Sequence, residues 1–356
     1  MEAFAAIKKT EPQGTYRGAV IGCGRMGSTI DDEHVGEPCY PWPWAHAPAM
    51  IEARGIELVA ASDPEPGQLD DFNRRWGTER LYADYREMVE AEGPDLVCVT
   101  TRPAPRAEIV TTLAELKVPA IYATKPMCVS LCEADEMVAS CKESETIFAV
   151  ACHLNWYACY RRALEYIQEG AIGKLQSMVC YSPGSLSNLQ SHTFALFSMF
   201  AGAPASWVVG VMDNDERAAA DGDLAGSGII MYENGVMAFM NSRGERNRRY
   251  NWRIELIGDA GRIISSNSHS QFELWSEHPE SGEQIRRPFH GPWHPRSSMV
   301  DAIEQICRCL DSGEQPFCTG ETGRETLEIA IALRESHRRR NGRVDLPLTD
   351  RTLKMG

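Results

Sequence analysis

The chain has 356 residues, 43% of them hydrophobic, and carries a formal charge of −14. Its length exceeds the size at which a single core usually stops growing, so we expect two domains. The negative charge argues against a nucleic-acid or anionic-membrane partner, because phosphate binding requires clustered lysines and arginines.

The chain has neither an apolar run of about 18 residues nor a signal-peptide pattern, so we expect a cytoplasmic protein with no membrane partner. It contains twelve cysteines, many of them in apolar strand-like runs, such as Cys98, Cys152 and Cys180. No C-x-x-C pair occurs. Reduced core thiols are therefore favoured over a disulfide framework or a metal site.

After a polar lead-in at residues 1–15, an apolar run breaks into the pattern G-x-G-x-x-G, formed by Gly22, Gly24 and Gly27. The pattern predicts a buried strand that turns tightly into a helix. Gly22 would permit the turn, Gly24 would let a pyrophosphate approach the backbone, and Gly27 would allow close helix packing. Any tight strand-to-helix turn can use such glycines, so the motif alone does not establish a dinucleotide site.

Residues 28–45 are rich in acidic, proline and aromatic residues and cannot continue a helix smoothly. We interpret them as an insertion. Its aromatic side chains, including Trp42 and Trp44, either pack over the domain or form a stacking wall for a sugar ring. A helix is expected to resume at residues 46–53.

The next apolar strand, residues 57–62, ends at Asp63. An acidic residue at this point usually binds the adenosine ribose hydroxyls and repels a 2′-phosphate, which favours NAD over NADP. The alternative is that Asp63 is simply a helix N-cap.

Further strands alternate with helical patterns. The strands are expected at 96–100, 120–123 and 147–151, and the helices at 68–76, 84–92, 106–117 and 132–144. This alternation predicts that residues 1–152 form an α/β Rossmann domain with a doubly wound parallel sheet.

The second half of the chain has successive short strands, at 175–181, 206–211, 228–231, 236–242, 252–257 and 262–264. Asn234 and Gly235 separate two of them at hairpin distance. Residues 153–356 are therefore expected to form an α+β domain with a large, open, mostly antiparallel sheet. A helix is expected at 299–311, and the last helix is expected to reach back toward the first domain.

Two polar clusters in this half have alternative interpretations. The segment 243–253 holds five arginines and is either a solvated strand end, an interface or an anionic-substrate pocket. His290, Trp293, His294 and Arg296 form a loop cluster that either lines the substrate site or is plain loop structure, without a metal-binding spacing.

Lys125 stands at the carboxyl end of a parallel strand and is followed by Pro126, which directs it toward the crevice where such folds bind ligands. Here the chain resembles the Gfo/Idh/MocA superfamily, which includes glucose–fructose oxidoreductase and inositol 2-dehydrogenase and carries Glu-Lys-Pro at this point. The resemblance extends through residues 169–173, 188–192, 258–261 and 327–344. It therefore spans nearly the whole chain.

The sequence departs from the family pattern at four positions. Thr124 replaces the usual Glu before Lys-Pro, and Arg106 and Asn155 stand where His and Arg are common. Asn188 replaces a common Asp, which puts the full family proton relay in doubt. Asn188 and His192, four residues apart, are expected to share one helical face.

The resemblance implies that His192 transfers the proton, that Lys125 assists it electrostatically and that Asn188 orients the substrate or the imidazole. NAD is the implied cofactor, and a homodimer or homotetramer through the second sheet is the implied assembly. The expected cofactor contacts are Gly22, Gly24, Arg25, Met26, Gly27, Asp63, Thr100, Thr101 and Lys125. The expected substrate contacts are Lys125, Asn155, Asn188, His192, Trp42 and Trp44.

Three functions remain open. The first is an NAD-dependent oxidoreductase that acts on a secondary hydroxyl of a sugar, cyclitol or glycoside. The second is a glycosidase of the same fold, in which NAD oxidises the sugar transiently. The third is a non-catalytic sugar- and nucleotide-sensing regulator, which the presence of Lys125 and His192 disfavours.

Overall fold

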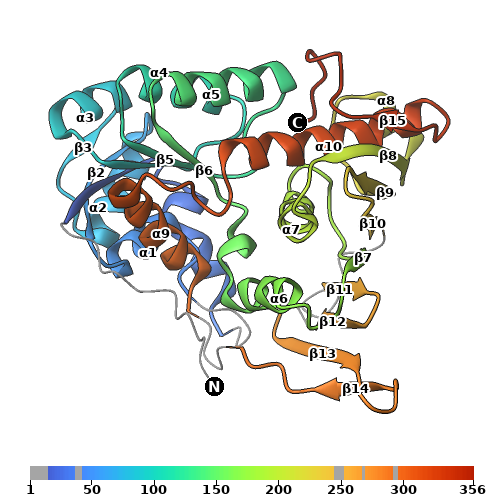
Figure 1. Cartoon of the computed structure of the whole chain (residues 1–356). Helices are drawn as coiled ribbons and strands as arrows, with labels where there is room; N and C mark the ends of the chain where they lie inside the picture. The colour runs from blue at the N-terminus through green and yellow to red at the C-terminus, as the bar shows by residue number, and fades with distance from the viewer. Residues whose placement is uncertain (1–14, 37–41, 244–251, 267–268, 292–295) are drawn as a thin grey trace.

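The computed structural model describes residues 15–36, 42–243, 252–266, 269–291 and 296–356. Within them the chain forms a six-stranded sheet from its first half and a nine-stranded sheet from its second half, arranged side by side (Figure 1). The predicted Rossmann sheet and the mostly antiparallel second sheet are thereby confirmed.

The first sheet is entirely parallel and has the order β3-β2-β1-β4-β5-β6. Its strands are β1 (Tyr16–Ile21), β2 (Ile56–Ser62), β3 (Leu81–Tyr82), β4 (Leu96–Val99), β5 (Ala120–Ala123) and β6 (Ile147–Val150). Every residue of β4 and β5 is buried, as expected for strands covered by helices on both faces. Strands β2 and β3 are added on one side of β1, and β4, β5 and β6 on the other. Ligands of such folds bind at this switch point, between β1 and β4.

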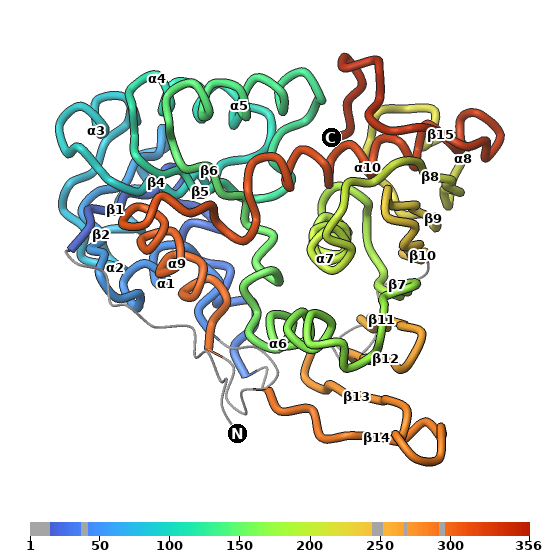
Figure 2. Tube along the Cα trace, viewed as in Figure 1, coloured from blue at the N-terminus to red at the C-terminus, as the bar shows by residue number. Residues whose placement is uncertain are grey.

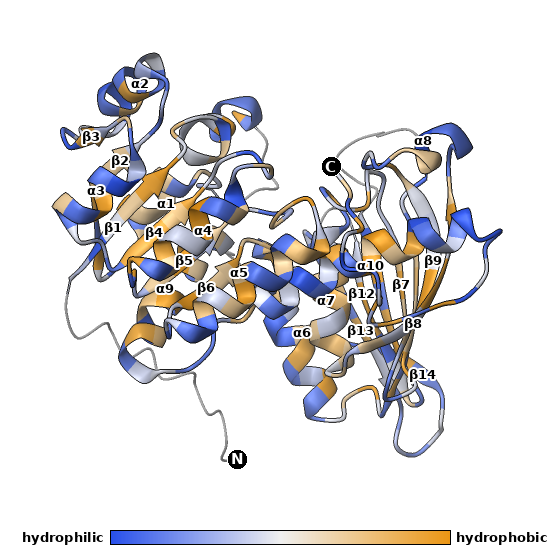
Figure 3. Cartoon of the chain, turned by 90° about the horizontal axis from the view of Figure 1, so that it is seen from above, coloured by the Kyte–Doolittle hydropathy of each residue, from blue (hydrophilic) through white to orange (hydrophobic). Residues whose placement is uncertain are grey.

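The helices that accompany this sheet are α1 (His46–Glu52), α2 (Pro66–Trp76), α3 (Tyr85–Glu92), α4 (Arg106–Glu115) and α5 (Leu131–Glu143). Local sequence defines their ends. The Asp84 side chain accepts the Arg86 amide at the start of α3, and Ser130 with Glu133 forms a capping box at the start of α5. Figure 3 shows that the strands of both sheets are largely hydrophobic, whereas α2 is largely hydrophilic.

The glycine loop opens two short helical turns, η1 (Arg25–Thr29, π-helical) and η2 (Ile30–His34, 3-10), instead of one long helix. The three glycines of the loop differ in their backbone conformation and in what a side chain would meet. Gly22 has φ of +95°, and a Cβ on Gly27 would overlap the carbonyl oxygen of Gly22. A Cβ on Gly24 would meet only Gln68 Oε1, at 3.9 Å, so the loop is open on that side.

The second sheet has the order β14-β13-β12-β11-β7-β10-β9-β8-β15, in which only β7 and β10 pair in parallel. Its strands are β7 (Leu175–Tyr181), β8 (Ala205–Met212), β9 (Gly226–Tyr232), β10 (Met237–Asn241), β11 (Arg253–Gly258), β12 (Gly261–Ser266), β13 (Gln271–Glu277), β14 (Gln284–Arg287) and β15 (Val344–Asp345). The sequence patterns did not predict β13, β14 or β15, which lie toward or at the sheet edges.

The remaining helices are η3 (His153–Trp156), α6 (Ala158–Gln168), α7 (Ser191–Ala201), α8 (Asp215–Ala219), α9 (Ser298–Ser312) and α10 (Gly320–Arg338). Two of them connect the halves of the molecule. Helix α9 follows β14 in the chain but packs on α1 and η3, and α10 contacts both α5 and β8 (Figure 2). Residues of the second half thus complete the layer beside the first sheet.

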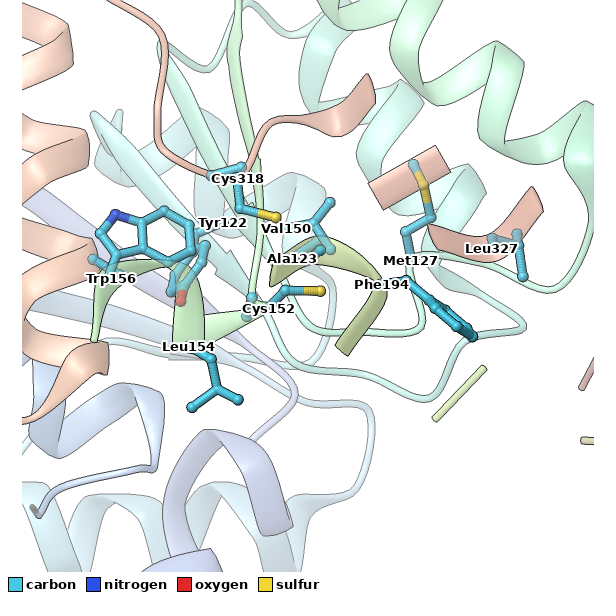
Figure 4. Close-up of a cluster of buried hydrophobic side chains, with 14 of the residues drawn as sticks. Tyr122, Ala123, Met127, Val150, Cys152, Leu154, Trp156, Phe194, Cys318 and Leu327 are labelled. Atoms are coloured by element: carbon cyan, nitrogen blue, oxygen red, sulfur yellow. The ribbon is translucent and has the colours of Figure 1, made fainter. Parts of the chain in front are cut away.

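One continuous core joins the two sheets. At the junction, Tyr122 from β5, Trp156 from η3 and Phe194 from α7 gather with Cys152 and Cys318 (Figure 4). The cysteines of the described ranges are unpaired, and all except Cys132 are buried. Within the same ranges no helix has the length and apolar character that a bilayer crossing requires.

We expect the Gly27→Ala variant to be destabilised by about 1–3 kcal/mol, because the added methyl group forces the glycine loop apart. Urea unfolding followed by circular dichroism measures this loss. The matched control is Gly24→Ala in the same loop, which has room for a methyl group and should unfold like the wild type. Equal midpoints for the two variants would contradict the packing role of Gly27.

Candidate active site

The guanidinium of Arg106 fixes the loops that follow β4 and β5. It is buried, with 1% of the residue exposed. Nη1 donates to the carbonyl oxygens of Thr124, at 2.7 Å, and Pro126, and Nη2 donates to that of Thr101. Burial lowers the pKa of Arg106 to about 10, so the group remains charged at neutral pH. The sequence marked Arg106 only as a departure from the family pattern.

Lys125 lies between two of these anchored carbonyls and is half-buried. Its Nζ donates a hydrogen bond to Asn188 Oδ1 at 2.7 Å. Burial, together with the charges of Arg25 and Arg106, lowers the pKa of Lys125 to about 8, against the opposite effect of Cys152 and Asp223. The ammonium group therefore titrates near physiological pH.

Asn188 is held by the backbone of a turn, not by a helix. The amides of Ser187 and Asn188 donate to the two carboxylate oxygens of Asp223, at 2.8 and 3.0 Å. Helix α7 begins only at Ser191, so the expectation that Asn188 and His192 share a helical face is wrong. The two residues are nevertheless brought to the same region, because the turn leads directly into α7.

His192 lies in the first turn of α7 and is 5% exposed. Its Nδ1 is buried and, within the described residues, has no hydrogen-bond partner. Burial holds the pKa of His192 well below its usual value, and nearby His153 and Lys125 lower it further. The imidazole is thus neutral at pH 7 and able to accept a proton.

A second imidazole, His153, stands against the first, and sequence reasoning missed it. The ring centroids of His153 and His192 are 4.7 Å apart in an edge-to-face arrangement. Nδ1 of His153 is 2.8 Å from the hydroxyl oxygen of Ser298 on α9. The only available signal was its position directly after β6, at the carboxyl edge of the sheet.

The insertion reaches the same region through Trp44. Its ring centroid lies 6.1 Å from that of His153 and 4.9 Å from that of His34. Asp31 holds the segment by accepting the amides of Trp44, at 2.7 Å, and Ala45, at 3.2 Å. Trp42 is half-buried and takes part in none of these ring contacts.

The glycine loop and Asp63 form the adjoining part of the site. Asp63 Oδ2 accepts the Cys23 amide at 2.8 Å, and Oδ1 accepts the Glu65 amide at 3.0 Å. Helix α2 starts after Glu65 without a side-chain cap, so the alternative that Asp63 is its N-cap is wrong. The Asp63 carboxylate instead braces the glycine loop.

Two threonines follow β4 beside this loop. Thr100 Oγ1 donates to the carbonyl oxygens of Ile21, at 3.0 Å, and Gly22. Thr101 Oγ1 is buried and has no hydrogen-bond partner within the described ranges. An open face at Gly24 and an unpaired buried hydroxyl fit a loop that binds a dinucleotide. Arg25 and Met26 begin η1 at its edge, where Arg25 pairs with Glu33 at 2.6 Å.

Asn155 lies apart from this group. Its Nδ2 donates to the Ala195 carbonyl oxygen at 3.4 Å, and the side chain lines a separate pocket between α7 and α10. Residues 244–251 and 292–295 lie outside the described residues, so most of the arginine-rich segment and both Trp293 and His294 do too. Of their neighbours, Arg296 pairs with Glu304 and His290 donates its amide to the Tyr166 hydroxyl. In the described ranges no group of His, Cys, Asp and Glu could hold a metal ion.

Comparison with known proteins gives matches over both sheets. Myo-inositol 2-dehydrogenase of Thermotoga maritima is 23% identical over 335 residues, covering 89% of this chain and 95% of that protein. 2,7-Anhydro-N-acetylneuraminate hydratase of Mediterraneibacter gnavus is 34% identical over 137 residues, which cover 37% of this chain and 34% of that protein. Among solved structures, a levoglucosan dehydrogenase in complex with NADH superimposes with a TM-score of 0.77 at 19% identity, covering 94% of this chain and 99% of its own.

Two family models cover most of the sequence. One, an oxidoreductase family with an NAD-binding Rossmann fold, matches residues 16–152, and the other, the C-terminal alpha/beta domain of the same family, matches residues 181–346. The order of the motifs, the two sheets and these matches agree, and the chain therefore belongs to the Gfo/Idh/MocA family of NAD-binding oxidoreductases.

Proposed function

We propose that the chain is an NAD-dependent oxidoreductase that acts on a secondary hydroxyl of a sugar, cyclitol or glycoside. The observation that carries this proposal is the half-buried ammonium group of Lys125, which donates a hydrogen bond to Asn188 and lies near the neutral imidazole of His192. Relatives named for myo-inositol and levoglucosan support the substrate class.

Each of these residues has a proposed part in the reaction. The bound cofactor supplies the hydride acceptor. His192 takes the hydroxyl proton, because its imidazole is neutral at pH 7. Lys125 stabilises the developing alkoxide by charge and hydrogen bonding, and Asn188 orients the substrate hydroxyl.

The cofactor is proposed to lie along the glycine loop, with its pyrophosphate at Gly24 and its adenosine ribose near Asp63. Arg25, Met26, Thr100 and Thr101 are the proposed neighbouring contacts. We propose that the boundary between the two domains lies between residues 152 and 153. The substrate is proposed to lie between the loops that follow β5 and β6 and the turn that precedes α7. Trp44 is the proposed aromatic wall of this site.

A second candidate is an oxidoreductive glycosidase, in which oxidation is transient and elimination, water addition and re-reduction follow. A relative named as a hydratase favours this candidate, because that name describes addition of water. The pair of Lys125 and His192 would serve the oxidation step in both candidates. A purely nucleotide-sensing regulator has no evident use for this pair.

The substrate proposal is tested with purified protein, NAD, and myo-inositol or levoglucosan, with absorbance at the NADH wavelength as the readout. Net NADH formation is expected for the dehydrogenase. Release of a chromogenic aglycone from nitrophenyl glycosides without net NADH would favour the glycosidase. If neither NADH nor aglycone forms although the protein binds NAD, the remaining function is that of a regulator.

Lys125→Ala should lower turnover by about 100-fold or more, because the charge that stabilises the alkoxide is lost. In the wild type, kcat/KM should fall as pH rises through about 8, where Lys125 loses its proton. Lys125→Arg is the control, because guanidinium keeps its charge throughout this range and its residual activity should lack the fall. An identical alkaline limb in both proteins would assign that limb to another group.

We also propose that the outer face of the second sheet forms a homo-oligomer interface. In the register of β7, β8, β9 and β10, Val179, Phe239, Ile229 and Val209 lie side by side on the face away from α7 and α10, and Tyr181 and Met237 flank them with 48% and 41% exposure. Uncovered apolar area of this kind marks an interface.

Sedimentation velocity should give a dimer or tetramer for the wild type and a monomer for Phe239→Lys, because a charge would be buried in the contact. The control Glu90→Lys introduces a lysine on α3, on the other side of the molecule, and should leave the assembly unchanged. A monomeric wild type at micromolar concentration would refute the proposed interface.

A further inference from the structure

We propose that His153 is a second substrate-binding imidazole, which receives the hydroxyl next to the one that His192 acts on, so that the substrate is a vicinal diol. This inference rests on the proposed function. It adds a specificity-determining residue and narrows the substrate class.

The placement of the ring carries the inference. His153 is half-buried and packs edge-to-face on His192, with 4.7 Å between the centroids. Nδ1 is engaged with the hydroxyl group of Ser298 at 2.8 Å. Nε2 has no partner within the described residues and is not sealed from solvent, so it is the nitrogen left for a ligand.

The state of the ring suits a ligand contact. Burial and the charge of Lys125 lower the pKa of His153 to about 4, which keeps the imidazole neutral at pH 7. A neutral imidazole has one donor and one acceptor. With Nδ1 occupied by Ser298, the tautomer determines whether Nε2 donates or accepts, and a sugar hydroxyl satisfies either case.

Three parts of the chain fix this ring from behind. Ser298 is the first residue of α9, and the preceding Ser297 caps that helix. The Ser297 hydroxyl also donates to the carbonyl oxygen of Pro43, next to Trp44 in the insertion. His153 is thus held by η3, α9 and the insertion, a precision that simple packing of a surface histidine does not need.

Because two neutral imidazoles lie in contact close to the charge of Lys125, they can contact two oxygens at once. His192 takes the reacting hydroxyl in the proposed reaction. The adjacent position in the site belongs to His153, and a neighbouring hydroxyl is the group that matches its single free nitrogen. Discrimination against a substrate that lacks this hydroxyl follows, because that substrate would cover Nε2 without offering it a hydrogen-bond partner.

The test compares His153→Gln with His153→Asn. A glutamine amide reaches the position of Nε2, whereas an asparagine amide reaches only that of Nδ1 and can keep the bond to Ser298. Kinetics are measured with myo-inositol and levoglucosan and with their monodeoxy derivatives. NAD affinity and the unfolding midpoint of each variant verify that the fold and the cofactor site are intact.

The wild type should prefer the parent sugar over one of its monodeoxy derivatives by at least about tenfold in kcat/KM, the effect of one buried hydrogen bond. In His153→Asn this preference should disappear, so that kcat/KM is about equal for the parent sugar and that derivative. The ratios of kcat/KM between the parent sugar and the other monodeoxy derivatives should stay as in the wild type. His153→Gln should retain part of it. Ser298→Ala, which leaves the imidazole in place but unanchored, should give an intermediate loss.

Two results would overturn the inference. If the ratios of kcat/KM between the parent sugar and its monodeoxy derivatives are unchanged in His153→Asn, whether or not turnover falls, His153 is only a packing residue. Better activity of His153→Asn than of His153→Gln would show that only the bond to Ser298 matters. A wild type that neither oxidises nor binds any of these sugars would instead refute the proposed function, and the inference with it.

Discussion

The buried guanidinium of Arg106 is the constraint on which the site depends. A charge in the interior is costly unless it is hydrogen-bonded, and here Nη1 and Nη2 donate to backbone carbonyls after β4 and β5, while the buried Nε has no partner within the described residues. Two of those carbonyls, of Thr124 and Pro126, flank Lys125, and the third belongs to Thr101 in the loop after β4. The position of the lysine is therefore fixed by the sheet edge, and not by its own flexible side chain.

The environment of the site then determines its charge states. Burial lowers the pKa of Lys125, His153 and His192, so one cation stands beside two neutral imidazoles. Water competes poorly for groups in such a place, and a single charge acts strongly on an oxygen atom that becomes negative. This combination suits the transfer of a proton from an alcohol better than it suits binding of an anion.

The second half of the chain contributes more than a separate sheet. Helix α9 returns to the first sheet and brings Ser298 to His153, while α10 lies along β8 and also contacts α5. A continuous core between the sheets leaves little freedom for these helices to shift. The imidazoles supplied by η3 and α7 consequently keep a fixed relation to Lys125.

The sequence by itself determined the features that depend on local patterns. The glycine spacing, the buried strands of the Rossmann sheet and the hairpin at Gly235 follow from backbone geometry and from the period of apolar residues, which neighbours in the chain encode. Motif order was enough to identify the family and to single out Lys125 and His192. Strand β14 contains a single apolar residue and β15 has only two residues, so neither shows an apolar run or a period that could be recognised.

Only the tertiary structure decided which polar groups meet. Arg106 donates to three backbone carbonyls and thereby fixes two loops. Asn188 lies in a turn and not in the expected helix, because Asp223, 35 residues away, accepts the backbone amides of that turn. His153 is oriented by Ser298, 145 residues away. Asn155 turned instead toward α7. Such pairings depend on burial and on hydrogen bonds between distant segments, which no local periodicity encodes, so they arise only when the two sheets and the returning helices pack together.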